Sequence, residues 1–485
     1  MKKSVYISIV ALFISNFAWS QNEGDALRYS QLYPSGTARF SAMGGAFGAL
    51  GGDFSSLSIN PAGLGVYRSS ELTFTPSLSF TNSSAKYYGS TNEDTKYNLN
   101  INNMGFLAAF SAKNKEGDGW KSGGFAMGYN RLSNFNKSIA IEGINNESSM
   151  AGYFASNANG TNFNNLDLFQ ENLAWQTYLI DTLGGSTKYV GAMSSNATKT
   201  QRKSTTTSGG IGEFVFSLGG NYNNKLYLGA TIGIQTVNYE ESSIYSEILP
   251  ISPSNDLNSF TYNNYLKTKG TGFNLKLGAI FRPVDWTRIG LAVHTPTFFS
   301  LEDNYNSKMT TNFNNGDKFI QESPEGSFQY ELNTPFRAVG SLAFIIMKRA
   351  IISADYEFVD YSNARFSAVD EDFIDENDAI RERYTATGNL RTGVEYKMGV
   401  FSLRGGYAFY GSPYKSTDEN KDASYSTISG GFGFVEKNFY FDLTYVRSLS
   451  SDKHYLYDSY GNVNVKPVYM TYNDNKILMT FGIRF

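Results

Sequence analysis

The sequence lacks several residue types, and each absence excludes a class of protein. None of the 485 residues is cysteine, which excludes disulfide scaffolds, thiol redox chemistry and cysteine zinc sites. Lysine and arginine (41) do not outnumber aspartate and glutamate (44), so the chain has no basic footprint for nucleic acid. Beyond the N-terminal segment, no apolar run reaches the ~20 residues that a transmembrane helix requires.

Histidine is also scarce, with only two in the chain. The sequence contains no Ser-His-Asp spacing, no paired-carboxylate motif and no cluster of metal-ligating residues. We therefore expect no enzyme activity, no metal site and no cofactor.

Aromatic residues and glycine are abundant instead. The chain has 37 Phe, 34 Tyr and 47 Gly, and only 18% of its residues are charged. A transmembrane β-barrel has this profile, because one face of each strand meets lipid while the other faces a polar lumen. The same division of faces is compatible with a mean hydropathy of −0.33.

The N-terminus has the pattern of a secretory signal. Two lysines precede an apolar stretch at 5–17, and Ala18 and Ser20 place small residues before a cut ahead of Gln21. The alternative is an N-terminal anchor helix that stays attached. We predict a signal at 1–20 and export of the rest of the chain.

Apolar residues alternate with small or polar ones along most of the chain. At the C-terminus, Ile477, Met479, Phe481, Ile483 and Phe485 share one face, as in a strand between lipid and a lumen. A terminal Phe on such a strand resembles the signal by which the outer-membrane assembly machinery recognises barrels.

The same alternation predicts thirteen further strands, which makes 14, an even number as closed bacterial barrels require. They lie near 72–80, 104–110, 125–129, 213–222, 226–235, 273–282, 288–294, 336–346, 352–358, 390–396, 401–409, 428–434 and 439–445.

Short turns alternate with long polar loops from residue 221 onward. The long loops are predicted near 240–260, 300–326, 362–381, 412–424 and 449–465. Short turns on one rim and long loops on the other are typical of outer-membrane barrels. A large soluble β-sandwich or propeller is the alternative. We predict an all-β fold, a 14-stranded antiparallel transmembrane barrel over 70–485.

Two segments do not fit a plain barrel. Residues 21–69 precede the first strand, and their middle is small and apolar, which indicates a plug inside the lumen. Gly45 and Gly48 superficially suggest a phosphate-binding loop, but the strand and the lysine of such a loop are absent.

The second segment is an insertion near 136–205, without clean alternation. Within it, residues 165–183 have helical spacing of apolar residues. By the alternation of rims this insertion lies outside the cell, where the helix would cap the lumen or simply pack within a folded loop. The residues that define this predicted capping helix are Phe169, Leu173, Trp175 and Leu179.

These features resemble the FadL/TodX family of outer-membrane transporters for long-chain fatty acids and aromatic hydrocarbons, in its Bacteroidetes branch. The resemblance covers nearly all of the chain after the signal. The residues that carry it are 36–46, Asp53, Asn60-Pro61-Ala62, 334–337, 354–356, 403–407 and Phe485.

The resemblance implies passive uptake of hydrophobic compounds through a barrel plugged by an N-terminal hatch. Asp53 and Asn60-Pro61-Ala62 match the hatch motif of the family. Ligand would pass through an internal apolar pocket and leave sideways at a kink in the third strand. The residues that could form this lateral opening are Gly123, Gly124, Gly128 and Asn130.

A fatty-acid carboxylate would require a cation in the lumen. The inward-facing candidates by strand parity are Lys276, Arg288, Arg337, Arg391 and Arg404. Inward acids also occur, at Glu213, Asp355, Glu357, Glu395 and Asp442. The alternative interpretation is a lumen of mutually paired charges that stiffen the barrel and hold the hatch.

Other functions remain open at this point. Some family members are labelled haemin receptors, and only His294 and His454 could serve as histidine ligands to haem iron. A barrel similar to this family is a partner in type IX protein secretion, and a general porin is a further alternative. The expected partners are outer-membrane lipid, lipopolysaccharide, a hydrophobic ligand and the assembly machinery through Phe485, with the chain a monomer.

Overall fold

The computed structural model describes residues 22–112, 117–250, 256–369 and 371–485. The predicted signal at 1–20 lies outside the described residues. No helix in the described ranges is long and apolar enough to cross a membrane.

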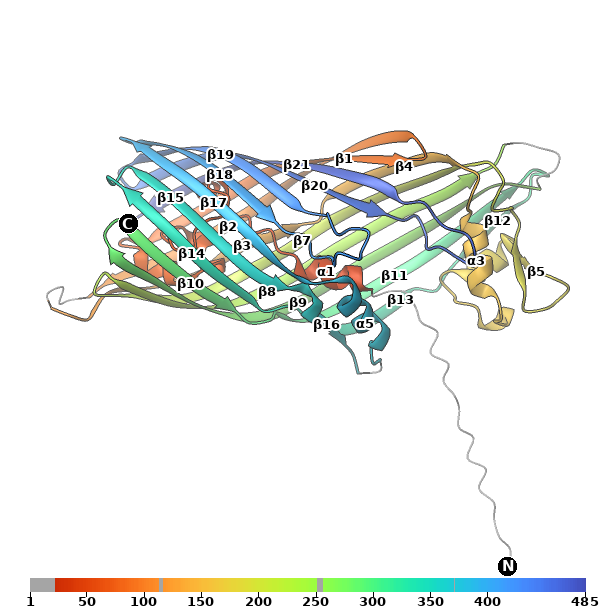
Figure 1. Cartoon of the computed structure of the whole chain (residues 1–485), viewed down its shortest axis with the longest axis horizontal. Coiled ribbons are helices and arrows are strands. Elements are labelled where there is room, and N and C mark those ends of the chain that lie inside the picture. The colour runs from red at the N-terminus through yellow and green to blue at the C-terminus, as the bar shows by residue number, and fades with distance from the viewer. Residues whose placement is uncertain (1–21, 113–116, 251–255, 370) are drawn as a thin grey trace, which may run out of the picture.

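The strands form a closed antiparallel barrel of 14 strands, which confirms the predicted fold class (Figure 1). Four of the barrel strands are divided into shorter segments, and β21 pairs with β1 to close the wall. In order around the barrel, the strands are β1 (Glu71–Tyr87), β2 (Ser90–Ser111), β3 (Trp120–Asn134) with β4 (Lys137–Asn145), β7 (Lys199–Tyr222), β8 (Leu226–Ile248), β9 (Leu257–Val284), β10 (Thr287–His294) with β11 (Phe298–Phe313), β12 (Lys318–Glu322) with β13 (Gly326–Asn333) and β14 (Arg337–Ile346), β15 (Ala350–Asp360) with β16 (Arg365–Ser367), β17 (Ala386–Met398), β18 (Phe401–Tyr410), β19 (Tyr425–Glu436), β20 (Phe439–His454) and β21 (Val468–Arg484).

Side chains alternate between the two faces of each strand, as the period of two predicts. Along β1, Leu72 and Phe74 are exposed on the outside, whereas Thr73 and Thr75 are buried on the inside. Apolar side chains cover the outside of most other strands in the same way. The barrel therefore presents an apolar belt outward and polar side chains inward.

Several strands are longer than the alternation predicts. β8 runs to Ile248 and β9 begins at Leu257, so most of the predicted loop at 240–260 is strand. β11 likewise occupies much of the predicted loop at 300–326. These strand ends carry Ser, Thr, Asn and Glu on both faces, so no apolar face marks them in the sequence.

The wall is tall on one side and low on the other. β7, β8 and β9 have 24, 23 and 28 residues, whereas β15, β17, β18 and β19 have 11, 13, 10 and 12. The rim with the short turns, which we call the short-turn rim, also carries the C-terminus (Figure 1). Beyond the low side lie a 3-10 turn, η4 (Tyr361–Asn363), and α5 (Ile374–Arg383).

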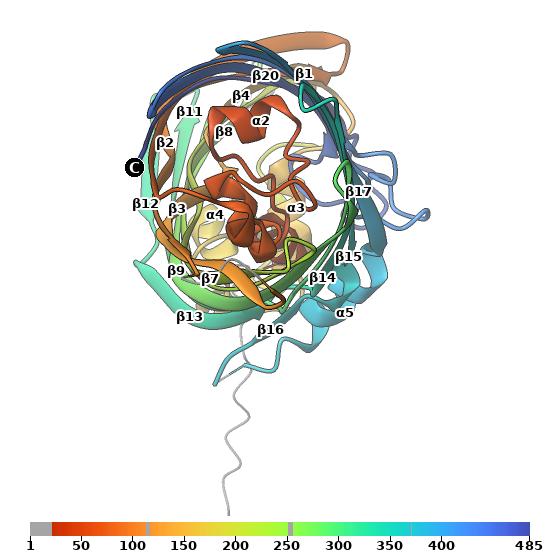
Figure 2. The ribbon, with the colours of Figure 1, turned by 90° about the vertical axis from the view of Figure 1, so that its left-hand side faces the viewer.

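The N-terminal segment lies inside the lumen, where it forms a hatch (Figure 2). Its elements are short, and each begins at a residue whose side chain caps the first turn. They are α1 (Glu23–Ser30), α2 (Ala38–Ala42) and the 3-10 helices η1 (Phe54–Ser58) and η2 (Pro61–Val66), with side-chain caps from Asn22, Thr37, Asp53 and Asn60.

The insertion after β4 folds as a cap at the long-loop rim (Figure 1). Its core contains Phe154 and Leu179, both buried. The prediction of one helix over 165–183 is wrong, since the only α-helix within that range spans six residues and a neighbouring helix precedes the range. The cap elements are α3 (Met150–Ala158), η3 (Phe163–Asn165), α4 (Glu171–Gln176), β5 (Ile180–Thr182) and β6 (Tyr189–Gly191).

Candidate functional site

Asn60 of the hatch motif fixes the hatch to the barrel wall. Its side-chain oxygen accepts a hydrogen bond from the Ala62 amide at 3.1 Å. Its amide nitrogen donates to the Gly48 carbonyl at 2.6 Å, and it lies 3.3 Å from the wall carbonyls of Ala279 and Leu291. One buried side chain thus joins two hatch turns to β9 and β10.

Asp53 organises the other part of the motif. Its carboxylate accepts hydrogen bonds from the Thr37 hydroxyl at 2.7 Å and from the Ser55 amide at 2.9 Å. Pro61 occupies the first turn of η2, where its missing N–H costs nothing, and Ala62 is completely buried. The hatch residues identified from the sequence therefore have structural roles.

A row of inward glycines lets the hatch lie directly on the wall. Gly124, Gly219, Gly229 and Gly278 are register neighbours across β3, β7, β8 and β9. A Cβ at Gly229 would lie 2.3 Å from the Pro61 backbone. Larger residues in this row would push the motif off the wall.

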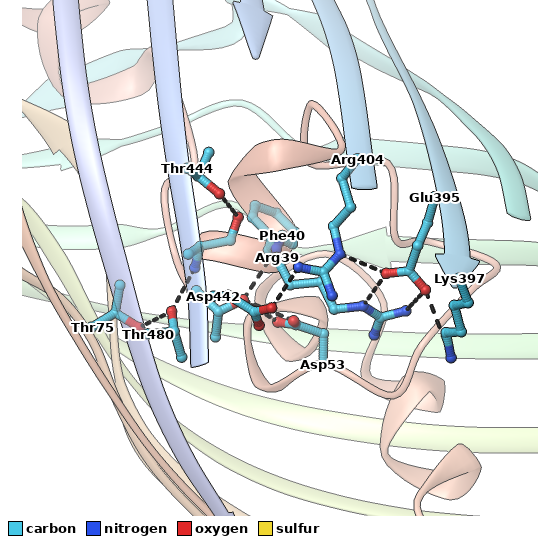
Figure 3. Close-up of polar contacts among 12 residues, drawn as sticks. Arg39, Phe40, Asp53, Thr75, Glu395, Lys397, Arg404, Asp442, Thr444 and Thr480 are labelled. Carbon is cyan, nitrogen blue, oxygen red and sulfur yellow. Dashed lines mark hydrogen bonds and ion pairs between the residues drawn. The ribbon is translucent and has the colours of Figure 1, made fainter. Parts of the chain in front are cut away.

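Four of the five lumen cations predicted from strand parity are paired with wall carboxylates. Arg404 contacts Glu395 at 2.7 Å and Asp442 at 2.5 Å (Figure 3). Arg39 of the hatch approaches the same Glu395 at 2.8 Å. A single carboxylate therefore bridges the hatch and the wall, and Lys397 lies beside it at 3.8 Å.

Three more of the predicted cations are held in the same way. Lys276 contacts Glu213 at 2.6 Å, and Arg337 and Arg391 share Glu357 at 2.7 and 3.2 Å. These ion pairs favour the interpretation of mutually paired charges over free ligand cations.

Arg288 and His294 also contact the hatch backbone. Arg288 donates to the Leu50 carbonyl, and His294 Nε2 lies 2.8 Å from the Ile59 oxygen. The pocket beside His294 has a volume of only 20 Å³, which is too small for haem. The described residues contain no group of three His, Asp or Glu that could hold a metal ion.

A much larger cavity, about 1320 Å³ in volume, lies between the hatch and the long-loop rim. Tyrosine rings and charged side chains line it, so it differs from the apolar pocket expected from the sequence. Its outer boundary includes the loops at 411–424 and 455–467, on the side where the wall is low.

Three lysines of this cavity have no ion-pair partner among the described residues. Lys203 Nζ lies 3.3 Å from His454 Nε2, and Lys137 Nζ lies 4.2 Å from the centre of the Tyr472 ring. Lys476 is the third. Acids also line the cavity. Even so, it holds several cations that make no ion pair in the described part of the chain, whereas most cations of the hatch region are paired.

The acids of the cavity include Glu241, Asp452 and Asp474. Strand parity could have identified Lys476, since it alternates with the outward Ile477. Lys137 and Lys203 lie in the region without apolar alternation, so strand parity could not identify them.

The hydrogen-bond ladder of the wall is interrupted where β2 separates from β3, although side chains of β2 and β4 still meet beyond it, as in the 2.5 Å contact between Ser138 and Asp94. Their pairing ends at Asn103 and Asn130, and in the described residues no ladder joins β2 to β3 or β4 beyond this point. The hatch takes the free edge of β3 instead. The Tyr33 amide donates to the Leu132 carbonyl at 2.9 Å, and the Ser35 amide donates to the Arg131 carbonyl at 3.0 Å.

The predicted opening residues lie near this interruption. Asn130 is the last residue of β3 that pairs with β2, and it donates to Ser58 of the hatch at 3.0 Å. Gly123, Gly124 and Gly128 lie on its short-turn side, where the β2–β3 pairing is continuous. Their role in an opening stays a prediction.

The cap is fixed to the barrel by the buried Glu247. Its carboxylate accepts hydrogen bonds from the Ser149 hydroxyl at 2.6 Å, the Met150 amide at 2.8 Å and Gln201 at 2.8 Å. Lys199, also buried, donates to the Ser195 carbonyl at 2.8 Å. The cap thus forms one unit with the inner faces of β7 and β8.

The four predicted capping residues do not share a helix. Leu173 and Trp175 lie in α4, whereas Phe169 precedes it and Leu179 follows it. Leu173 and Leu179 are buried in the cap core, which supports packing within a folded loop.

No family model and no curated protein matches this sequence. Solved structures do match its fold. A Pseudomonas aeruginosa FadL homologue matches with a TM-score of 0.56 at 12% identity, over 93% of this chain and 99% of that chain. The Pseudomonas putida toluene transporter TodX matches with a TM-score of 0.52 at 12% identity, over 93% and 98%. The chain therefore shares its fold, a 14-stranded barrel plugged by its own N-terminus, with the FadL homologue and TodX.

Proposed function

We propose that this protein is an outer-membrane barrel that passively takes up hydrophobic compounds with an anionic head group, such as long-chain fatty acids. The apolar outer belt supports insertion in a membrane. The fold shared with a FadL homologue and a toluene transporter supports uptake of hydrophobic molecules. The observation that carries the head-group assignment is that Lys137 and Lys203 line the cavity and make no ion pair within the part of the chain that the structure describes.

The anionic head would bind at these lysines, which make no ion pair with a wall carboxylate among the described residues. Lys203 and His454 converge within 3.3 Å, and both can donate hydrogen bonds to a carboxylate. A charge-assisted hydrogen bond of this kind contributes about 1.5–3 kcal/mol. A purely hydrocarbon ligand would gain nothing from these groups.

Ligand would reach the cavity from the low side of the wall. The cap covers the long-loop end, and its core and Glu247 hold it there. The loops at 411–424 and 455–467 border the cavity and are the segments that have to let ligand pass.

Ligand would leave through the wall interruption between β2 and β3. A lateral route suits an alkyl chain because each CH₂ that enters water costs about 0.8 kcal/mol. In this route the segment around Tyr33 moves off the free edge of β3. Asn102, which donates to the Ser35 hydroxyl at 2.5 Å, separates from the hatch in the same step.

Two measurements test the proposal. Mass spectrometry of the barrel purified in detergent should find co-purified amphipathic anions. Displacement of a fluorescent fatty acid should weaken about tenfold or more in Lys203→Gln, but not in the control Lys308→Gln, whose exposed lysine pairs with Glu322 outside the cavity. Equal displacement in both variants would refute the head-group assignment. Co-purified secretion components with no bound lipophile would favour the partner-barrel alternative.

A further inference from the structure

The first helix of the hatch reaches the low side of the wall. There α1 lies beside α5, although the two helices are far apart in the sequence (Figure 1). Tyr384 directly follows α5, and its hydroxyl donates to the Glu23 carbonyl at 3.0 Å. Asn22 and Arg28, at the start and near the end of α1, line the lumen cavity. α1 therefore contacts the segment beyond the low wall and borders the cavity at the same time.

Arg383, the last residue of α5, joins α1 to a loop that borders the cavity. Its Nη1 donates to the Glu23 carboxylate at 2.5 Å, and its Nε donates to the Asp418 carboxylate at 3.0 Å. Glu23 belongs to the hatch, whereas Asp418 belongs to the loop at 411–424. The Glu23 and Asp418 side chains are 23% and 12% exposed, so water screens the two contacts only in part. One guanidinium thus bridges the hatch and the loop.

The loop at 411–424 is also bound through its backbone to the residues at the end of α5. The Lys415 amide donates to the Arg383 carbonyl, and the Thr385 amide donates to the Pro413 carbonyl, both at 2.8 Å. Because these hydrogen bonds fix Arg383 to the loop, a displacement of the loop moves the guanidinium away from Glu23.

The other end of α1 leads to the wall interruption between β2 and β3. The Gln31 carbonyl, one residue past α1, accepts a hydrogen bond from Ser133 of β3 at 3.0 Å. The amides of Tyr33 and Ser35 then occupy the free edge of β3. The 8 residues of α1 span roughly 12 Å, because an α-helix rises about 1.5 Å per residue. α1 therefore connects the low wall to the interruption as one continuous element.

We propose that Arg383 couples the entry loop at 411–424 to the exit. When the loop opens for a ligand, Arg383 releases Glu23, and α1 and the segment around Tyr33 are then free to move off β3. The direction of this coupling rests on the proposed function, which places entry at the loop and exit at β3. Coupling between two sites is reciprocal, so a looser α1 also loosens the loop. Arg383 thereby keeps the exit closed until the loop has opened.

An engineered disulfide tests the coupling in the full chain, in detergent micelles and without ligand. The chain contains no cysteine, so Tyr384→Cys with Tyr414→Cys introduces a single pair. These residues are partners in an antiparallel bridge, where the usual Cα spacing of about 4.5–5.5 Å suits a disulfide. Hydrogen exchange compares the oxidised variant, whose loop is locked to the end of α5, with the same variant after reduction. Oxidation should slow exchange of the α1, Tyr33 and Ser35 amides about fivefold.

Arg383→Gln in the disulfide variant shows whether the arginine transmits the effect. Oxidation should then slow only the loop amides. Slower loop amides with unchanged hatch amides in the variant that keeps Arg383 would overturn the proposal, and so would an equal slowing of the hatch amides without Arg383. Because no ligand is present, either result would leave the uptake proposal intact.

A single substitution keeps the proposal testable if the two cysteines prevent folding. Arg383→Gln alone should speed exchange of the loop amides and of the Tyr33 and Ser35 amides about fivefold. The control Arg381→Gln, in the same helix, should change neither set, since Arg381 pairs with Asp378 within α5. Faster exchange at the loop alone would show that the exit does not depend on Arg383 and would overturn the proposal.

Discussion

The two ends of the lumen use the same residue types in different ways. In the hatch region, Arg39 and Arg404 share Glu395, and the wall and hatch are joined by these contacts. In the cavity, Lys137 and Lys203 lack such partners among the described residues. Charges that are neutralised by the protein hold structure, whereas charges that are not neutralised remain available to a ligand.

The largest expected effect comes from breaking the central ion pair of the hatch region. Glu395→Gln leaves two arginines without a full counter-charge in a buried site. Removal of one partner of a buried ion pair lowers the free energy of unfolding by about 3–5 kcal/mol. Urea unfolding in micelles should show this loss.

The same variant should also loosen the plug. Single-channel conductance should rise in Glu395→Gln and stay unchanged in Glu322→Gln, whose carboxylate is exposed and pairs with Lys308. Unchanged stability and conductance in Glu395→Gln would show that this ion pair does not hold the hatch.

A smaller loss of unfolding free energy is expected from a substitution in the glycine row on which the hatch lies. Gly229→Ala places a Cβ 2.3 Å from the Pro61 backbone, and overpacking of this kind costs about 1–3 kcal/mol. Gly340→Ala is the matched control in another strand, with open space at the Cβ position. Equal unfolding midpoints for the two variants would contradict the close approach of the hatch and wall.

The cap should respond to pH through Glu171, which lies outside the membrane-spanning strands. Burial raises the pKa of its carboxyl from 4.5 to about 7. The folded cap therefore binds a proton more tightly than the unfolded cap. Its stability is fully present below pH 4.5 and falls as the pH rises to 7, by at most about 1.4 kcal/mol per pH unit.

Hydrogen exchange of the α3 and α4 amides, corrected for intrinsic rates, measures this effect. Protection should be higher at pH 5 than at pH 8 in the wild type. Glu171→Gln removes the titrating group and should show equal protection at both values. A pH dependence that persists in this variant would assign the effect to another group.

Strand parity was sufficient to place the lumen charges but not to pair them. Arg404 and Asp442 both alternate with outward apolar residues, so their inward direction could be predicted. Their contact depends on Gly433 of the intervening strand, where a Cβ would lie 2.4 Å from the Asp442 carboxylate. The register that places this glycine between them arises from the closed barrel, which sequence parity does not determine.

The cavity and the wall interruption were not predictable for a related reason. Lys203 lies in the outer part of β7, which is polar on both faces. Lys137 begins β4, where Ile139 and Ile141 follow it on the inward face, so an outward apolar face is missing there. The segment around Tyr33 has no alternation, and its pairing with β3 depends on the departure of β2. Long-range contacts of this kind have no local signature in the sequence.

The smallest effect on stability is expected for a cavity lysine, and it tests the difference between the two ends of the lumen most directly. Lys203→Gln removes a charge that makes no ion pair in the described ranges of the chain, so the free energy of unfolding should change by less than about 0.5 kcal/mol. Lys276→Gln removes a buried cation that pairs with Glu213 at 2.6 Å, and it should lose several kcal/mol. The two variants change the same residue type in the same lumen. A stability loss in Lys203→Gln equal to that in Lys276→Gln would mean that the cavity lysines also hold the structure, and the division of the lumen into a structural and a binding end would fail.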